Sequence, residues 1–258
     1  MVRNDAQRAE LRQALDAARA QYGQEAMELI PHIMALGDYC YTICDYRAAV
    51  DVYSYGLFVI EVRRAGGSKE EAQLLHRIGC ALLKQGCTKS GIEALEKASS
   101  CAEQCPDKAA SGYYECLFEL GNAWFSTGRA DSAKPYFKRC TQGYDAQHNN
   151  EMLDKALLML VDCHIALGRH HKAIPLLERS VSIRIKMFGS DHLATAESMH
   201  RLADTLNLVG RTSEVEQLLR SVIVIREKHL AETDPQLLEA RKGLHSALEK
   251  TNPLPLEQ

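Results

Sequence analysis

The sequence predicts an all-α protein built from repeated helix hairpins, and three observations support this class. Glycines recur at nearly equal intervals along the chain, and they are Gly86, Gly128, Gly168 and Gly210. Large apolar residues recur in step with them. Between the glycines, apolar residues are spaced by three or four, as in amphipathic helices. Repeats of this length are stacked units that cannot bury their apolar faces alone.

The large apolar residues define five copies of the repeat. They are Tyr53, Leu95, Phe137, Leu177 and Leu219. The first copy has no turn glycine, but the interval from Gly86 to Gly128, counted back from Gly86, reaches Cys44. We therefore predict a degenerate first copy in which Cys44 takes the place of the glycine.

Each copy is predicted to be a helix, a turn and a second helix, as the third copy illustrates. Leu117, Leu120 and Trp124 lie on one helix face, and Gly128 ends that helix. Glycine suits the turn because a helix ends well on a residue that accepts positive φ. Small residues are expected where two helix axes approach closely. They are Gly37, Gly79 and Gly121 in first helices, and Ala49, Ala133 and Ala173 in second helices.

The predicted elements follow in order along the chain. Residues 1–23 form an N-terminal capping helix, five repeats occupy 24–66, 67–108, 109–149, 150–190 and 191–232, a C-terminal capping helix covers 233–250, and 251–258 form a tail. Capping helices are expected because the end repeats of a solenoid otherwise expose apolar surface. Asp191 and Asp234 are predicted helix N-caps, and Pro235 suits the first turn after such a cap.

The composition is that of an ordinary globular protein. Of the 258 residues, 46% are hydrophobic and 25% are charged, and the net charge of −3 gives no electrostatic reason to expect nucleic acid as a partner. No run approaches the roughly 20 apolar residues of a membrane-spanning helix, so membrane insertion is not expected. The N-terminus lacks the apolar core of a signal peptide, and nine cysteines cannot all pair within the chain. We therefore expect reduced thiols and a cytoplasmic location.

The sequence offers little catalytic chemistry. It has no phosphate-binding glycine loop, no His-Glu-x-x-His motif and no Gly-x-Ser-x-Gly motif. Cys40 and Cys44 are four residues apart, as are Cys101 and Cys105, whereas zinc sites favour Cys-x-x-Cys. Cys40 and Cys140 fall at core positions, where cysteine acts as a small hydrophobic residue. We predict a non-enzyme with no metal site and no cofactor.

The repeat pattern resembles the tetratricopeptide repeat family. The family order is a bulky residue, Leu-Gly, an aromatic residue, a turn glycine, alanine, an aromatic residue and a small residue. The third copy supplies it as Leu117, Leu120, Gly121, Trp124, Gly128, Ala133, Phe137 and Cys140. The fourth copy places Asp162 where the small residue is expected, and the fifth places Val215 and Val222 at the alanine positions.

The period of about 42 residues resembles the long repeats of kinesin light chains rather than the usual period of about 34. Residues 176–193 and 219–235 look like the helix ends of that branch, with Leu193 in place of a proline that Pro235 keeps. The resemblance implies a right-handed superhelical solenoid whose first helices line a concave face.

The resemblance also implies which side chains face the concave groove. They are Met34, Asp38, Tyr41, His76, Cys80, Lys84, Glu115, Phe118, Asn122, Phe125, Met159, Cys163, Leu167, His200, Asp204 and Asn207. The apolar middle of this set suits an extended or helical segment with apolar anchors. The alternative is that part of the lining packs against the N-terminal helix or a neighbouring chain. An acidic Asp38 argues against the carboxylate clamp of chaperone-binding members.

A second predicted surface is basic. Lys172, Arg179 and Lys186 recur every seven residues, with Arg184 nearby. This basic strip suits an acidic partner surface, although such strips are commonly solvated helix faces.

Two functions follow from these expectations. The first is a non-catalytic scaffold or adaptor that binds a partner protein, and its resemblance to kinesin light chains suggests a subunit of a cytoskeletal or ciliary assembly. The second is a regulatory domain that senses a small peptide or the redox state of exposed cysteines. The scaffold predicts a stoichiometric protein partner, whereas the sensor predicts a tight small ligand or a mobility shift on oxidation.

Overall fold

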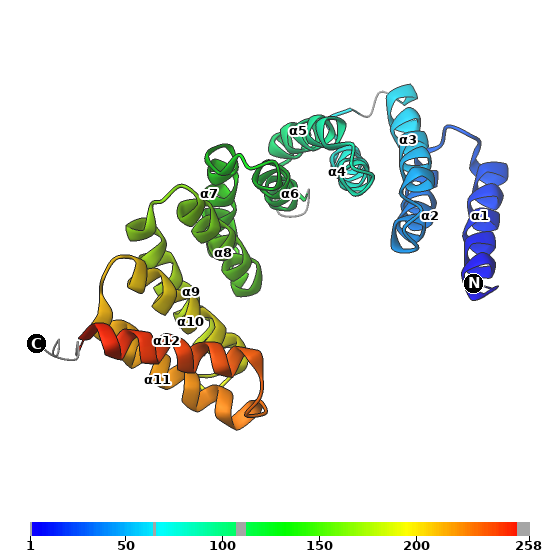
Figure 1. Ribbon diagram of the computed structural model, residues 1–258. Coiled ribbons are helices and arrows are strands. Elements are labelled where there is room, and N and C mark those ends of the chain that lie inside the picture. Colours follow the sequence, from blue (N-terminus) through cyan, green and yellow to red (C-terminus); the bar gives the residue numbers. More distant parts are fainter. Residues whose placement is uncertain (1, 64–65, 107–111, 252–258) are drawn as a thin grey trace, which may run out of the picture. The chain divides into compact units, whose positions relative to one another are not determined.

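The computed structural model describes residues 2–63, 66–106 and 112–251, with the backbone alone for 2–5 and 251. Its helices are α1 (Val2–Tyr22), α2 (Ile30–Thr42), α3 (Tyr46–Val62), α4 (Lys69–Lys84), α5 (Thr88–Gln104), α6 (Tyr113–Ser126), α7 (Ala130–Ala146), α8 (Asn150–Ala166), α9 (His170–Phe188), α10 (Leu193–Leu208), α11 (Thr212–His229) and α12 (Pro235–Thr251), and a 3₁₀ turn η1 (Met27–Leu29) precedes α2. No strand occurs in these ranges, so the predicted all-α class is confirmed (Figure 1). Residues 252–258 of the predicted tail lie outside the described residues.

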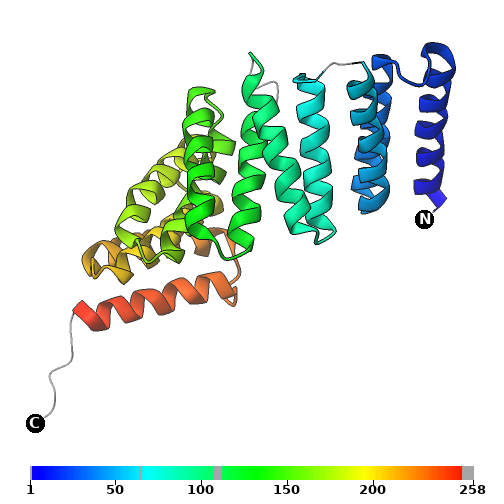
Figure 2. The same ribbon diagram turned by 90° about the horizontal axis from the view of Figure 1, so that it is seen from above.

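The helices fall into two compact units, residues 1–128 and 129–258, with the division in the turn between α6 and α7. In the first unit α1 packs on α2, and each of α2 to α5 packs on the next helix in the chain. In the second unit the same holds from α7 to α12. Within each unit consecutive helices run in alternate directions, as hairpin packing requires (Figure 2). No helix within the described ranges is long and apolar enough to cross a membrane.

The predicted degenerate turn at Cys44 is confirmed. Gly86 has φ +80°, and Cys44 adopts the same left-handed conformation with φ +64°. The hydrogen bonds match as well: the N–H of Gly86 donates to the Leu83 carbonyl at 3.0 Å, and that of Cys44 donates to the Tyr41 carbonyl at 3.0 Å. This conformation costs a residue with a Cβ about 1–2 kcal/mol, so the repeat geometry overrides the local preference of cysteine.

The apolar residues that define the five copies are all buried. Tyr53, Leu95, Phe137, Leu177 and Leu219 are no more than 1% exposed. Two of the predicted small residues leave room for them, since a Cβ on Gly37 would overlap the Tyr53 ring and one on Gly79 would lie 2.6 Å from Leu95 Cγ. The close approach of first and second helices is thus confirmed at these two glycines.

The helix starts confirm one predicted cap and correct the other. The Asp234 carboxylate accepts a hydrogen bond at 2.8 Å from the backbone N–H two residues on, as expected of a cap of α12. At α10 the cap is His192, whose Nδ1 accepts from the Ala194 N–H at 3.1 Å. Asp191 instead pairs with Lys228 of α11 at 3.0 Å. The prediction for Asp191 was wrong because the helix begins later than a cap at 191 requires.

The fourth repeat also corrects the predicted register. Val161, not Asp162, takes the small-residue position, and it is fully buried among Ala173 and Leu177. In the other copies the small residue lies seven residues before the turn residue, as Gly79 does before Gly86, and the residue seven before Gly168 is Val161. Asp162 therefore faces the next first helix.

Candidate functional site

The first helices of the first unit carry two adjoining pockets, called here the Tyr41 pockets. One has a volume of about 330 Å³ and is lined by Asp38, Tyr41, Tyr53, His76, Arg77 and Cys80. The other has a volume of about 390 Å³, and Tyr41 and Cys80 line it together with Lys84, Glu119 and Asn122. Six of the residues predicted for the concave face thus meet on α2, α4 and α6. Arg77 and Glu119 were not predicted.

Asp38 is the most constrained side chain of the Tyr41 pockets. Its carboxylate accepts hydrogen bonds from Tyr53 Oη at 2.6 Å and from Arg77 Nε at 2.7 Å. Burial and the bond to Asp38 raise the pKa of Tyr53, which keeps the phenol protonated. Asp38 thereby ties α2 to α3 and α4, and it acts as a wall of the pocket.

The same kind of link recurs in the second unit. Asp162 of α8 pairs with Arg201 of α10, and the two residues have the same separation in the sequence as Asp38 and Arg77. In both cases the aspartate lies six residues before its turn residue, and the arginine lies nine before the next turn. Each pair joins consecutive first helices. The sequence signal was present, but it is visible only after the turns are aligned.

Cys80 is shared by the two pockets, and His76 of the first pocket lies beside it. His76 Nε2 lies 3.4 Å from Cys80 Sγ. Burial, assisted by Arg77, lowers the pKa of His76 to about 4, and burial together with Glu119 raises the pKa of Cys80 to about 12. At neutral pH the pair is an uncharged imidazole and a protonated thiol. A nucleophilic cysteine needs the opposite protonation, so the pair suits hydrogen bonding to a ligand better than catalysis.

The remaining predicted residues of the first unit lie beside the Tyr41 pockets. Met34 is half-buried and packs on the core of α2–α4. Glu115 is exposed at the start of α6, and Phe118 and Phe125 are half-buried on the same helix. The two phenylalanines are absent from the lining of both pockets, so the apolar anchor points predicted for the groove are separate from the pockets.

In the second unit the predicted concave residues do not form one site. Met159 and Leu167 of α8 are half-buried, Asp204 of α10 is exposed, and Cys163 is fully buried in the core. His200 is only 8% exposed, because the buried Arg226 covers it with Nη1 at 3.2 Å from His200 Nδ1. The prediction that His200 contacts a partner is therefore corrected.

Asn207, on the same helix, is also engaged. Its side-chain oxygen accepts a hydrogen bond from Lys250 of α12 at 2.9 Å. The Asn207 side chain thus contacts α12 of the same chain, which is neither the N-terminal helix nor the neighbouring chain of the alternative.

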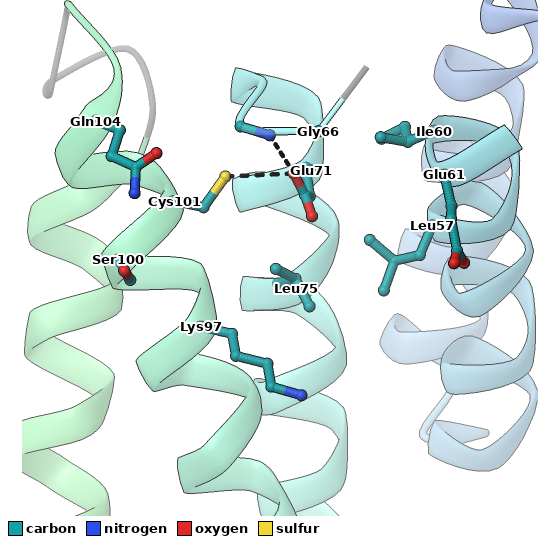
Figure 3. Close-up of a pocket in the computed structure, with 11 residues that line it drawn as sticks. Leu57, Ile60, Glu61, Gly66, Glu71, Leu75, Lys97, Ser100, Cys101 and Gln104 are labelled. Carbon is teal, nitrogen blue, oxygen red and sulfur yellow. Dashed lines mark hydrogen bonds between the residues drawn. The ribbon is translucent and has the colours of Figure 1, made fainter. Parts of the chain in front are cut away.

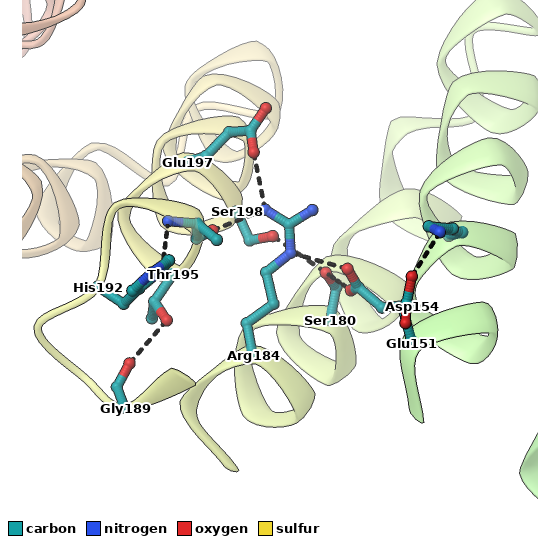
Figure 4. A network of polar contacts seen from close by, with 11 residues as sticks. Glu151, Asp154, Ser180, Arg184, Gly189, His192, Thr195, Glu197 and Ser198 are labelled. Carbon is teal, nitrogen blue, oxygen red and sulfur yellow. Dashed lines mark hydrogen bonds and ion pairs between the residues drawn. The ribbon is translucent and has the colours of Figure 1, made fainter. Parts of the chain in front are cut away.

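Arg184 of the predicted basic strip is buried, which corrects that prediction. Its Nε donates to Asp154 at 2.8 Å, and its Nη1 donates to Glu197 at 2.9 Å and to the Ala194 carbonyl at 2.6 Å (Figure 4). Ser180 adds a bond to the same aspartate. Arg184 lies two residues before Lys186, so it faces inward between α8 and α10.

The other members of the basic strip differ in their surroundings. Arg179 pairs with Asp145 of α7 at 2.5 Å. Lys172 and Lys186 are exposed. The strip is therefore broken at two of its four positions, and Lys172 belongs instead to a groove between helices.

Pairs of second helices border further grooves, and three of these are named by the helices that border them. The α3–α5 groove has a volume of about 810 Å³ and a mixed lining, in which the Cys101 thiol faces Glu71 at 3.6 Å (Figure 3). The α7–α9 groove measures about 510 Å³ and the α9–α11 groove about 450 Å³. Sequence reasoning missed these grooves because each is shared by two repeats. Within the described residues, no group of three or more His, Cys, Asp or Glu side chains could hold a metal ion.

Comparison with known proteins agrees with this architecture. Residues 153–228 match the family model described as tetratricopeptide repeat. The protein KINESIN LIGHT CHAIN-RELATED 2 of Arabidopsis thaliana is 30% identical over 112 residues, which make up 43% of this chain and 17% of that relative. The match thus spans a small part of the relative's length.

Solved structures share the fold at low sequence identity. BtubC (BKLC) from P. vanneervenii superposes with a TM-score of 0.70 at 15% identity, over 90% of this chain and 94% of that one. YrrB, a TPR protein with an unusual peptide-binding site, superposes with a TM-score of 0.60 at 14% identity, over 89% and 98%. The fold and these likenesses define a helical-repeat protein. Residues 153–228 are tetratricopeptide-like by this match, and the long repeats are similar to those of kinesin light chain-related proteins.

Proposed function

We propose that this chain is a non-catalytic scaffold that binds an extended or helical segment of a partner protein at the Tyr41 pockets. The observation that carries the proposal is that two pockets adjoin on one face and share Tyr41 and Cys80. Their volumes, about 330 and 390 Å³, are at the small end of ligand sites and suit side chains of a peptide. Binding energy would come from the aromatic wall, with polar groups fixing orientation.

The chemistry of the pockets supports a peptide that presents both hydrogen-bond donors and acceptors. His76 is neutral and Cys80 is protonated at pH 7. Lys84 and Glu119 stand in the second pocket with opposite charges. A peptide with a polar or charged side chain beside an apolar one satisfies this lining, whereas a highly charged ligand of one sign does not.

The relatives support a role inside a larger assembly. The names of the Arabidopsis relatives point to kinesin light chains, and YrrB is described as having a peptide-binding site on this fold. We extend this to the chain as a cytoplasmic adaptor in a cytoskeletal or ciliary assembly. The step rests on similarity of fold and repeat.

The redox form of the sensor alternative cannot use Cys80, Cys101 or Cys163 and would have to use the exposed thiols, Cys44 and Cys87. Burial raises the pKa of Cys80 to about 12 and those of Cys101 and Cys163 to about 11. Oxidation proceeds through the thiolate, so these three thiols react slowly at neutral pH. A sensor of small peptides would use the same Tyr41 pockets, and it differs from a scaffold in binding a free peptide tightly.

The proposal is tested by affinity capture with quantitative mass spectrometry. The variant Tyr41→Ala/Lys84→Ala is compared with the matched control Tyr22→Ala/Lys242→Ala, whose side chains are exposed away from the pockets. We expect a partner that is retained by the parent and the control and lost from the pocket variant, with helicity unchanged and Tm lowered only by the lost packing of Tyr41 on the core. Equal retention by all three proteins would show that the Tyr41 pockets are not the interface.

A further inference from the structure

The α7–α9 groove of the second unit concentrates positive charge. Its lining includes Lys134 and Lys138 from α7, and Arg169 and Lys172 from the turn and first residues that lead into α9. No aspartate or glutamate is among the residues that line it. Four cations on one groove of about 510 Å³ create a positive potential that focuses on its interior.

Little of this charge is neutralised by the protein. The carboxylate of Asp131, which is 69% exposed, forms ion pairs with both Lys134 at 2.9 Å and Arg169 at 3.6 Å. Within the described residues, Lys138 and Lys172 take part in no ion pair. One carboxylate therefore pairs with two of the four cations, and the other two, Lys138 and Lys172, are available to a ligand.

A buried polar atom of this groove has no partner among the described residues. His164 of α8 is part of the lining, and it is the ring Nδ1 that is buried without a hydrogen bond. Burial, then Lys134, Lys172 and Arg169, lower the pKa of His164, so the ring is neutral and can donate one N–H. Because Nδ1 is itself closed off from solvent, a ligand in the groove would meet the other ring nitrogen, Nε2, whose N–H can donate to an acceptor oxygen.

The basic lining is specific to this groove. The neighbouring α9–α11 groove has the same place in the architecture but is lined by Ile185, Met199 and Val224 with one arginine, Arg220. The α3–α5 groove of the first unit includes Glu61 and Glu71. Second helices can thus pack together without basic residues between them. The cluster of basic residues at the α7–α9 groove is specific to this pair of repeats.

We propose that the α7–α9 groove binds an acidic peptide segment of a partner protein. Carboxylates of the segment pair with Lys138 and Lys172, and one carboxylate oxygen accepts the His164 N–H. Leu160, Leu176 and Pro135 form an apolar part of the lining that suits an apolar side chain between the acidic ones. This site lies on second helices and does not depend on the Tyr41 pockets.

Other anions fit the groove less well. An inorganic phosphate has no apolar part to cover the leucines. A nucleic acid needs a longer basic track, and the track stops here, since Arg179 is paired with Asp145 and Arg184 is buried. The peptide is therefore the occupant that uses both halves of the lining.

The test is fluorescence anisotropy of the full chain with a labelled peptide that contains Glu-Glu-Leu-Glu-Glu, beside its Gln-Gln-Leu-Gln-Gln counterpart. The variant Lys138→Glu/Lys172→Glu is compared with Lys89→Glu/Lys242→Glu, which changes net charge equally at exposed lysines outside the groove. We expect the groove variant to bind the acidic peptide at least about tenfold more weakly, and the control to bind within about twofold of the parent.

Three results would overturn the proposal: no saturable binding by the parent, equal weakening in both variants, or displacement of the peptide by inorganic phosphate or single-stranded DNA at equal charge concentration. The variant His164→Phe gives a second readout, since it keeps every lysine. Peptide affinity should fall about threefold, which is the loss expected when one hydrogen bond is removed, while Tm is unchanged or raised. A lower Tm with unchanged affinity would contradict the role given to His164.

Discussion

Two arginines at equivalent positions of the fourth and fifth repeats show which part of the repeat is constant. Arg184 and Arg226 are both buried, with 9% and 3% exposure. Each donates from Nη1 to the backbone carbonyl near the start of the following first helix, at 2.6 Å in both cases. The accepting residues, Ala194 and Gln236, lie equally far along the chain from their arginines. The arginine therefore fastens one repeat to the next through the backbone.

The surroundings of the two arginines differ. Arg184 has the carboxylates of Asp154 and Glu197 within 2.9 Å, and although burial lowers its pKa, those carboxylates outweigh the burial and raise it. Arg226 faces His200, has no ion pair within the described residues, and burial lowers its pKa. Both arginines thus keep the hydrogen bond to a backbone carbonyl, but only Arg184 has carboxylates that balance its charge. Stability should respond differently at the two joints.

The largest effect is expected for Arg184→Met. It leaves Asp154, only 7% exposed, as a buried carboxylate held by Ser180 alone. Removing one partner of a buried ion pair costs about 3–5 kcal/mol. The free energy of unfolding, measured by urea denaturation followed by circular dichroism, should fall by this amount.

The matched control is the double variant Asp154→Leu/Arg184→Met. It removes both charges, so most of the lost stability should return. A double variant as unstable as the single one would mean that the backbone bond, not the ion pair, dominates at this joint.

A smaller loss is expected for Arg226→Met. The substitution leaves no unpaired carboxylate, and the Gln236 carbonyl belongs to an exposed residue that water can reach. The cost should be about 1 kcal/mol, that of the hydrogen bonds removed. Denaturation curves of the two methionine variants measured side by side make the comparison direct. Equal losses would refute the difference between the joints.

The next effect is a pH dependence at the Arg226 joint. Burial lowers the pKa of His200, opposed by Asp204 and assisted by Arg226, with Glu239 also facing the ring. A folded-state pKa below the unfolded value of about 6.5 means that stability is complete above that pH and is lost as the pH falls. A protonated His200 also cannot accept the Arg226 hydrogen bond. The urea midpoint should drop more between pH 7.5 and 5 in the parent than in His200→Asn, and parallel curves would contradict this.

The smallest effect is expected for Asp191→Ala, at the surface of the joint between α10 and α11. Asp191 and Lys228 are both more than half exposed, so their pair contributes no more than about 0.5 kcal/mol. A true N-cap would cost about 1 kcal/mol and would not depend on salt. Melting curves at low and high salt distinguish the two, and a salt-independent loss of the larger size would restore Asp191 as a cap.

The parts of the fold that repeat could be predicted from the sequence. The turn at Cys44 was found by interval alone, since five copies fix a position even where the residue is atypical. The fully buried Tyr53 and Leu219 followed from the same interval. Apolar spacing is a property of one helix, so a single chain segment is enough to reveal it.

The parts that depend on two repeats at once were missed. The sequence of its own helix predicts that Arg184 is exposed, because that sequence contains no sign of Asp154, which contacts Arg184 from another helix. The Asp38–Arg77 link and the lysines of the α7–α9 groove are likewise shared between helices of different copies. The prediction for Asp162 was out of register by one residue, as counting seven residues back from Gly168 shows. Ion pairs between repeats can be predicted only once the alignment of the helices is known, and that alignment comes from the structure.

The confinement of contacts to nearby parts of the chain has a mechanical consequence. Within the described residues, helices pack on those next to them or next but one, as the bond from Lys250 of α12 to Asn207 of α10 illustrates. Contacts this close in sequence lose little loop-closure entropy, so each hairpin can re-form quickly after it opens. Either unit, when pulled from its two ends, should therefore lengthen in steps of one hairpin and recover in the same steps, since the hairpins within it are held by their neighbours.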